Sequence, residues 1–349
     1  MPSHRILLLG FGFLVLLLAC SEDPSRQLIQ AAREGDTDRV EVLLDQGAQI
    51  NTKDYSSSHM TVLMLAAENG HADTVQALLE RGAKIDAEDM DGRTALMLAA
   101  EKGDREMVRM LLDKGAELNS ADTQGRTALL SATLQGRTES VRALLEKGAD
   151  VDKADHGKKT ALMVAAGNGS ADIVRALLEK DAQIEAKDNL GMTALMYGSQ
   201  NGHLEVVSDL LEKGANVLAW AGDGRTSLIL AAEKGHTQVV QTLLEKGASI
   251  GARDNRDRTA LIGAAENGQT ETVLALLKKR AKINETDKGG RTALGWAAFK
   301  GHTETVKALL DRRARTDIPD VDGWTALMWA EKQGNTEIAD LLQQAESRR

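Results

Sequence analysis

The sequence predicts an all-α protein, a solenoid of about ten helix-turn-helix units joined by turn or hairpin loops. Two observations carry this prediction. A threonine recurs at intervals of 33 residues, and a Val/Ile-x-x-Leu-Leu pattern follows each copy. A period of this length is typical of repeat proteins, whose units bury their apolar faces against one another. The threonines are Thr61, Thr94, Thr127, Thr160, Thr193, Thr226, Thr259, Thr292 and Thr325.

Length, net charge and cysteine content exclude several classes of protein. A chain of 349 residues would ordinarily suggest two or three domains, but a repeat array is one elongated body. The net charge of −9 argues against nucleic-acid binding, which needs a broad positive field. The single cysteine, Cys20, excludes an internal disulfide framework and a cysteine zinc site.

The N-terminus is predicted to be a targeting segment. Arg5 precedes an apolar run of 14 residues, 6–19, which is too short for a membrane span of about 20 residues. The run ends in Leu-Leu-Ala-Cys and resembles a bacterial lipobox, so residues 1–19 are the expected signal peptide and Cys20 the lipidation site. By the same resemblance, Ser21 favours the outer membrane, periplasmic side, over the inner membrane. The alternative is an ordinary signal peptide with a chance cysteine.

One unit shows how each element is predicted. Residues 89–93, Asp-Met-Asp-Gly-Arg, form a turn, and the Thr94 hydroxyl caps the helix predicted for 95–102. A second helix is expected over 105–114, because its valine and leucines recur on one face. Gly115 then ends that helix, in the left-handed conformation that glycine adopts most easily.

The ends of the array differ from its middle. The first helix pair lacks the threonine start and carries polar residues, and the last pair ends in polar and charged residues, as terminal caps do. We therefore expect a tether over 20–24 and a repeat domain over 25–346, with an N-terminal cap at 25–57, repeats over 58–319 and a C-terminal cap at 320–346.

The unit G-x-T-A-L-x-x-A-A followed by V-x-x-L-L-x-x-G-A strongly resembles the ankyrin repeat, over roughly residues 25–345. One departure is uniform: the family's T-P-L-H reads T-A-L-M or a variant here. The resemblance implies a non-enzymatic scaffold that binds a protein on a concave face, made of the turn tips and the exposed side of each first helix. It also implies a structural role for the histidines of one repeat position, His71, His203, His236 and His302.

No motif for catalysis or metal binding stands out. The turn of Asp89 and Asp91 is similar to a calcium loop, but Leu98 occupies the place of the closing glutamate. Residues 157–160, Gly-Lys-Lys-Thr, lack the order of a phosphate-binding loop. We expect no enzyme, no cofactor, no metal and no small-molecule substrate.

Positions that vary between copies are the candidates for binding. The residue before the threonine is basic in most units, which could grip an acidic partner or simply pair with the turn aspartates. Aromatic residues gather in the second half and are either binding hot spots or a cover for the core. The candidates are Arg93, Arg126, Arg225, Arg258, Arg291, Tyr197, Trp296, Phe299, Trp324 and Trp329.

A basic edge lies one unit apart in the last repeats and would suit an acidic surface or an anionic envelope polymer, unless it is only solvated. It comprises Lys278, Lys279, Arg280, Lys282, Arg312, Arg313 and Arg315.

Glycine is replaced at several positions where a left-handed backbone is expected, namely Lys158, Asp181, Arg280 and Arg313. Since a side chain in that conformation costs roughly 1 kcal/mol, we expect the array to loosen first around 155–185 and near its C-terminal end.

Together these features predict a monomeric lipoprotein of the bacterial cell envelope that captures a protein partner. Two alternatives remain: a structural or protective envelope protein that binds a polymer or lipid surface through the basic edge, and a secreted effector that binds host proteins.

Overall fold

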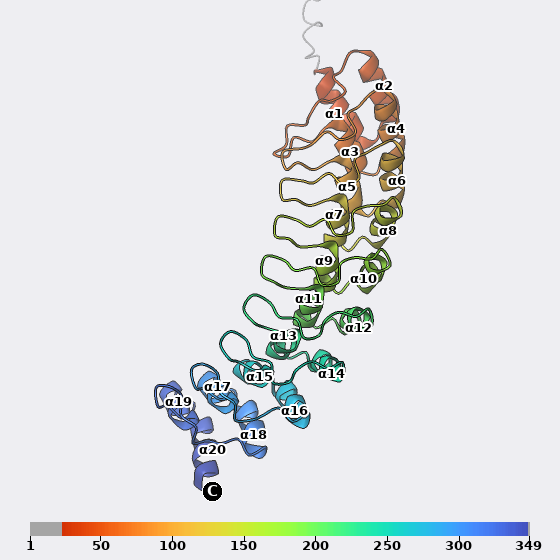
Figure 1. Cartoon of the computed structure of the whole chain (residues 1–349). Helices are drawn as coiled ribbons and strands as arrows, with labels where there is room; N and C mark the ends of the chain where they lie inside the picture. The colour runs from red at the N-terminus through yellow and green to blue at the C-terminus, as the bar shows by residue number, and fades with distance from the viewer. Residues whose placement is uncertain (1–22, 348–349) are drawn as a thin grey trace, which may run out of the picture. The chain divides into compact units, whose positions relative to one another are not determined.

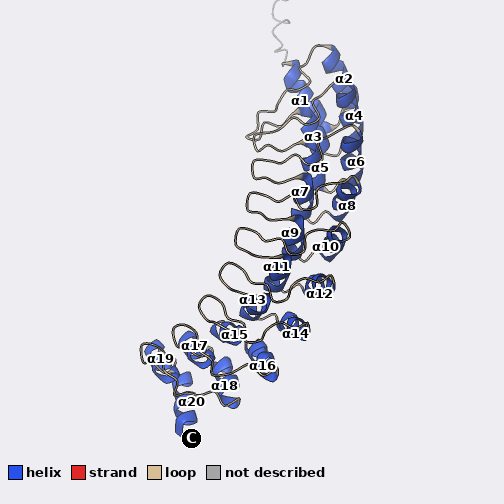
Figure 2. Cartoon of the chain, viewed as in Figure 1, coloured by secondary structure: helices blue, strands red, loops and turns tan. Residues whose placement is uncertain are grey.

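The computed structural model describes residues 23–347 (Figure 1). Within this range the chain forms 20 α-helices and no β-strand, which confirms the all-α solenoid (Figure 2). The helices make ten pairs, called repeats one to ten below. Their bounds are α1 Pro24–Glu34, α2 Thr37–Asp45, α3 Val62–Glu68, α4 Ala72–Glu80, α5 Ala95–Lys102, α6 Arg105–Asp113, α7 Ala128–Leu134, α8 Thr138–Glu146, α9 Ala161–Asn168, α10 Ala171–Leu178, α11 Ala194–Asn201, α12 Leu204–Glu212, α13 Ser227–Lys234, α14 Thr237–Glu245, α15 Ala260–Glu266, α16 Thr270–Lys278, α17 Ala293–Lys300, α18 Thr303–Asp311, α19 Ala326–Gln333 and α20 Thr336–Ser347.

The chain divides into two compact units, the first ending at Thr123 and the second beginning at Gln124. The first unit holds α1 to α6 and the second holds α7 to α20. In the second unit each odd-numbered helix packs on the next odd-numbered helix, and each even-numbered helix on the next even-numbered one. In the first unit α1, α3 and α5 pack in the same way. Each repeat therefore contributes one helix to each of two layers.

Every odd-numbered helix from α3 onward begins at a repeat threonine. The hydroxyl accepts a hydrogen bond from the backbone N–H three residues later, at 3.1–3.4 Å in all nine copies. This satisfies a backbone donor that would otherwise lack a partner at the helix start, as predicted for Thr94. Alanines one turn later, such as Ala99 and Ala100, are fully buried and let the neighbouring helices approach closely.

Long loops connect each even-numbered helix to the next threonine, and we call the hairpin-like part of each loop a finger (Figure 2). Adjacent fingers within a unit are joined by single backbone hydrogen bonds. In the second unit these include Asn189 N–H to Gly157 O at 3.0 Å and Gly222 N–H to Leu190 O at 2.8 Å. Fingers and odd-numbered helices together form one surface of each unit, which we call the inner face (Figure 1).

The replaced glycines adopt the predicted backbone. Asp181, Arg280 and Arg313, which follow even-numbered helices, have φ of 58°, 69° and 62°, and Lys158 in a finger has 59°. Two further residues of this kind were not predicted, His59 with φ 51° and Asp257 with φ 59°. Asp257 occupies the finger position that glycine holds in most other repeats, so its positive φ could have been predicted from the sequence.

The ends of the described chain are polar. Helix α1 starts at Pro24, and Asp23 accepts a hydrogen bond from the Ser25 backbone N–H at 3.0 Å. Helix α20 extends over 12 residues to Ser347, and its Glu337, Asp340 and Gln344 are exposed. Cys20, the expected signal peptide and most of the expected tether lie outside the described residues. None of the described helices is long and apolar enough to cross a membrane.

Candidate functional site

A buried or half-buried aspartate organises most of the fingers. It stands five residues before the repeat threonine in most copies, as at Asp89, Asp188 and Asp254, which are 6–7% exposed. One carboxylate oxygen of Asp89 accepts from the backbone N–H groups of Asp91 and Arg93 at 2.9 and 2.8 Å. The second oxygen remains for a side-chain donor, and the identity of that donor differs along the array.

The arginine before the threonine is one such donor. Arg93 Nε donates to Asp89 at 2.9 Å, and Arg258 Nε donates to Asp254 at 2.9 Å. Arg225 lies at 2.7 Å from Asp223 and at 3.1 Å from Glu233. Arg93, Arg225 and Arg258 are therefore engaged in internal ion pairs, and Arg258 is only 5% exposed.

Aromatic residues four positions after the threonine are the alternative donors. Tyr197 donates its hydroxyl to Asp188, Trp296 Nε1 donates to Asp287 at 2.7 Å, and Trp329 Nε1 donates to Asp320 at 2.8 Å. Burial raises the pKa of the Tyr197 hydroxyl well above its ordinary value, and the bond to Asp188 adds to the rise. These side chains thus connect helix and finger within one repeat.

The aromatic residues of repeats nine and ten form one cluster, as their sequence spacing predicts. Phe299 packs edge-on against Trp296 at 5.8 Å and against Trp329 at 4.9 Å, and Trp324 lies 5.0 Å from Trp329 between ring centroids. The guanidinium of Arg291 lies 4.3–4.9 Å from three of these ring centroids. All four rings are partly buried, and they make many of their contacts with one another and with Arg291.

A groove runs along the inner face of the second unit beneath Tyr197. One hollow of about 380 Å³ is lined by residues of α7, α9, α11 and two fingers. A second hollow of about 350 Å³ lies over the fingers that follow α10 and α12. Tyr197 lines both hollows, so they lie next to each other, and together we call them the groove. The lining includes Gln124, Arg126, Leu130, Leu134, Asp155, Lys159, Met163, Val164, Gly167, Asn168, Tyr197 and Asn201 in the first hollow, and Asn189, Leu190, Met192, Gln200, Ala221, Gly222, Asp223 and Arg225 in the second.

Exposed apolar side chains border the second hollow. Leu190 is 68% exposed at a finger tip, and Trp220 is 64% exposed two residues before Gly222. Lys187 Nζ lies 5.6 Å from the Trp220 ring centroid and donates to the Trp220 carbonyl at 3.0 Å. The sequence prediction omitted Trp220, although it is the most exposed tryptophan; its finger also has Ala221 where other fingers have the aspartate.

All seven side chains of the basic edge are exposed. Three of them pair with nearby acids: Lys279 with Glu245 at 3.4 Å, Lys282 with Glu285 at 3.3 Å, and Arg315 with Asp317 at 2.8 Å. Exposed pairs of this kind contribute little to stability and remain open to exchange with other anions.

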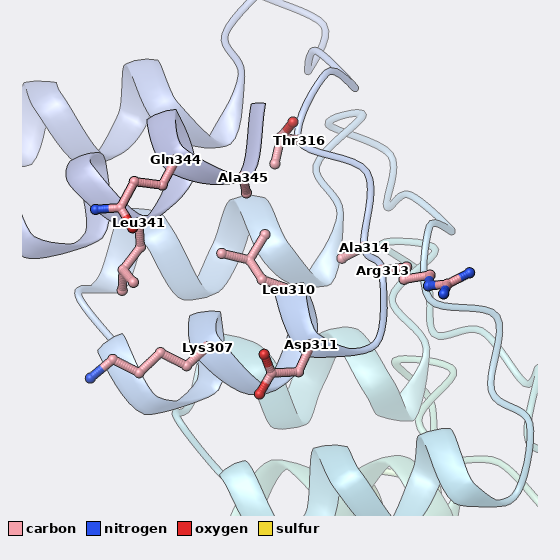
Figure 3. Close-up of a pocket in the computed structure, with 9 residues that line it drawn as sticks. All are labelled: Lys307, Leu310, Asp311, Arg313, Ala314, Thr316, Leu341, Gln344 and Ala345. Carbon is pink, nitrogen blue, oxygen red and sulfur yellow. The ribbon is translucent and has the colours of Figure 1, made fainter. Parts of the chain in front are cut away.

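A further hollow, of about 530 Å³, lies between α18, α20 and the loop that joins α18 to the last finger (Figure 3). Leu310 and Leu341 give it an apolar lining, and the Arg313 guanidinium points away from the other labelled residues (Figure 3). Thr316 is buried here, at a position where the preceding loops carry isoleucine, leucine or valine.

The histidines act as predicted, within the array. Nε2 of His71, His203, His236 and His302 lies 2.9–3.0 Å from a carbonyl oxygen of the preceding repeat. Across residues 23–347 no cluster of three or more His, Cys, Asp or Glu side chains could hold a metal ion.

The comparison with known families agrees with this architecture. The family described as "Ankyrin repeats (3 copies)" matches residues 10–89, 28–122, 82–155, 153–219, 216–287 and 280–348. No individual curated protein matches the chain. Proteins of this family generally act as non-enzymatic scaffolds for protein–protein interaction. Because the matches cover nearly the whole sequence, the chain belongs to the ankyrin-repeat family.

Proposed function

We propose that this protein is anchored by lipid on Cys20 in a bacterial cell envelope and captures a partner protein on its inner face. The observation that carries the proposal is the groove at Tyr197, where partly exposed apolar side chains and polar groups line two adjacent hollows. Such a mixture of apolar surface and placed polar groups is typical of binding sites.

The rigidity of the scaffold supports a binding role. Most fingers are held by an aspartate, by the threonine cap and by a backbone bond to the neighbouring finger. A surface that is already ordered loses little conformational entropy when a partner binds, so more of the contact energy remains as affinity.

The position of the array relative to Cys20 supports anchoring. Helix α1 starts at Pro24, so only residues 21–23 separate the proposed lipid-bearing cysteine from the first repeat. A chain attached to two or three acyl groups stays membrane-bound, whereas one acyl chain alone binds weakly. The first repeat would then lie close to the membrane surface.

Two measurements test this function. The full-length protein is crosslinked in its native envelope, purified and analysed by mass spectrometry, and the proposal requires a reproducible protein partner. In parallel, Cys20→Ser is expected to release the protein from the membrane fraction. Membrane retention of Cys20→Ser would contradict lipid anchoring, and an absence of any crosslinked protein would contradict partner capture.

The exposure of all seven basic-edge side chains favours a second candidate, binding of an anionic polymer or lipid surface. Sedimentation with vesicles of anionic and of neutral lipid, using unlipidated Cys20→Ser protein, tests it. The second candidate requires binding to anionic vesicles only, with a steep loss as salt is raised.

A further inference from the structure

We infer that the groove under Tyr197 binds an extended peptide segment in which an apolar side chain lies next to a carboxylate. This inference rests on the proposed function and names the chemistry of the partner. It depends on three features of the second unit: an interruption in a row of glutamates, an apolar floor, and a lysine beside that floor.

The row of glutamates stands seven residues after the repeat threonine, on the inner face. It comprises Glu68, Glu101, Glu233 and Glu266. Glu233 lies 3.1 Å from Arg225 and 2.9 Å from Arg258, and Glu266 lies 2.7 Å from Arg258. Glu233 and Glu266 thus neutralise the arginines before the threonines of their repeats, and an approaching carboxylate would meet negative charge there.

Repeats four, five and six interrupt this row. Leu134, Gly167 and Gln200 occupy the glutamate position there, while Arg126 and Lys159 keep the basic position before the threonine. Of the side chains that line the first hollow, Lys159 is a cation, Asp155 is a carboxylate, and Arg126 already interacts within the array. Lys159 has no glutamate of this row beside it, so its ammonium group favours a carboxylate on the partner.

The position of Lys159 suits it to bind such a carboxylate. Its Nζ lies 5.2 Å from the centroid of the Tyr197 ring, and its backbone N–H donates to Asp155 at 2.9 Å. The Tyr197 hydroxyl is already bonded to Asp188, so the ring is held in place as one wall. An ammonium group beside a fixed aromatic wall can bind an acid while an apolar neighbour of that acid packs on the ring.

The floor of the groove is apolar, and one of its residues is a glycine. Leu134 is 40% exposed, and Val164 is partly exposed beside it. Gly167 lines the first hollow and contributes no side chain to it. Asn168 and Asn201 use their amide nitrogens on the carbonyls of Leu134 and Gly167 at 3.3 and 2.7 Å, which leaves each with an acceptor oxygen for a peptide N–H.

The size and closeness of the two hollows favour an extended segment. Each hollow, at about 380 and 350 Å³, has room for a few side chains and none for a folded domain. Because Tyr197 lines both hollows, an extended peptide that passes Tyr197 would place one anchor on α7 and α9 and the next beside Leu190 and Met192.

Replacing Gly167 with glutamate restores the interrupted row and tests the inference. A Cβ added at Gly167 would have its nearest neighbours at 3.8 Å, and this glycine does not have a positive φ, so the substitution fits the fold. Gly167→Gln adds the same bulk without charge. Gly251→Glu is the charge control, because Gly251 is exposed, has no atom within 4 Å of an added Cβ and does not line the groove.

The probes are two fluorescein-labelled octapeptides with a central pair of leucines, one flanked by glutamates and one by lysines, titrated into the full chain in detergent. We expect the glutamate peptide to bind at least about tenfold more tightly than the lysine peptide. Gly167→Glu should weaken the glutamate peptide about tenfold, Gly167→Gln clearly less, and Gly251→Glu hardly at all. Equal binding of both peptides, or equal losses with Gly167→Glu and Gly167→Gln, would overturn the inference.

The same variants separate this inference from the proposed function. If wild-type protein crosslinks a partner in the envelope and Gly167→Glu crosslinks it equally well, partner capture is supported, but the inference that the partner binds in the groove is contradicted. If wild-type protein captures no partner, the proposed function itself fails. A loss of capture in Gly167→Glu, with capture kept in Gly251→Glu, supports both.

Discussion

Replacing Asp181 with glycine is expected to stabilise the array, although it removes a side chain. Asp181 follows α10 with φ of 58°, and the corresponding residues of neighbouring repeats, such as Gly148 and Gly214, have φ of 86° and 89°. A Cβ on either glycine would meet no atom within 4 Å, so the position is open and only backbone strain distinguishes the two residue types.

The magnitude follows from that strain. A side chain in the left-handed region costs roughly 1–2 kcal/mol, less for aspartate, which tolerates this region better than most residues. The greater freedom of glycine in the unfolded chain offsets part of the gain. The expected net change for Asp181→Gly is a gain of about 0.5–1 kcal/mol in the free energy of unfolding.

Urea unfolding and hydrogen exchange measure this gain. A shift of the urea midpoint by roughly 0.3 M is expected, with exchange slowed about threefold in α9 and α10. Gly148→Asp is the matched control and should have the opposite effect one repeat earlier. Unchanged or faster exchange in Asp181→Gly, or no loss in Gly148→Asp, would refute the link between left-handed side chains and local weakness.

Three further predictions concern the cluster of repeats nine and ten and the two kinds of glycine. Arg291→Ala should lower the free energy of unfolding of the C-terminal repeats by about 2 kcal/mol in urea titrations followed by tryptophan fluorescence, because three ring contacts and the ion pair with Asp320 are lost. Burial alone would raise the pKa of Asp320, but hydrogen bonds from Trp324, Trp329, Asp322 and Arg291 outweigh it and lower the pKa. The stabilisation from Asp320 is therefore present above the unfolded pKa of about 3.9 and lost as the pH falls through the lower folded value, and Asp320→Asn should abolish this acid dependence of the fluorescence. Gly224→Ala should destabilise the protein more than Gly214→Ala in thermal unfolding, because a Cβ at Gly224 would lie 2.7 Å from the Asn255 backbone nitrogen, whereas Gly214 is open.

Strict periodicity made the fold predictable. Thr94 and its eight equivalents mark the helix starts, and each of them caps its helix in the structure. The second helix of repeat three, predicted for 105–114, ends at Asp113, because Lys114 and Gly115 form the turn that closes it. Local signals of this kind depend on a few neighbouring residues, so a single sequence is enough to interpret them.

The candidate site was harder to predict, because it depends on which side chains meet across repeats. Trp296, Phe299 and Trp329 were correctly placed together, but the sequence did not show that Arg291 fills the space between them. Predicting the groove at Tyr197 would have required the positions of three helices and four fingers. Aligning the repeats would have revealed one part of it, the missing glutamate at Gly167.

Crosslinking from defined positions tests the central claim, that a partner binds on the inner face of the second unit. A photoreactive amino acid is placed at Asn168, which is exposed in the groove, and separately at Gln241, which is exposed on the even-numbered helix α14. On irradiation of the native envelope, we expect a specific partner protein to crosslink to position 168, and we expect no crosslink of that protein to position 241. The same crosslink from position 241, with none from position 168, would contradict it.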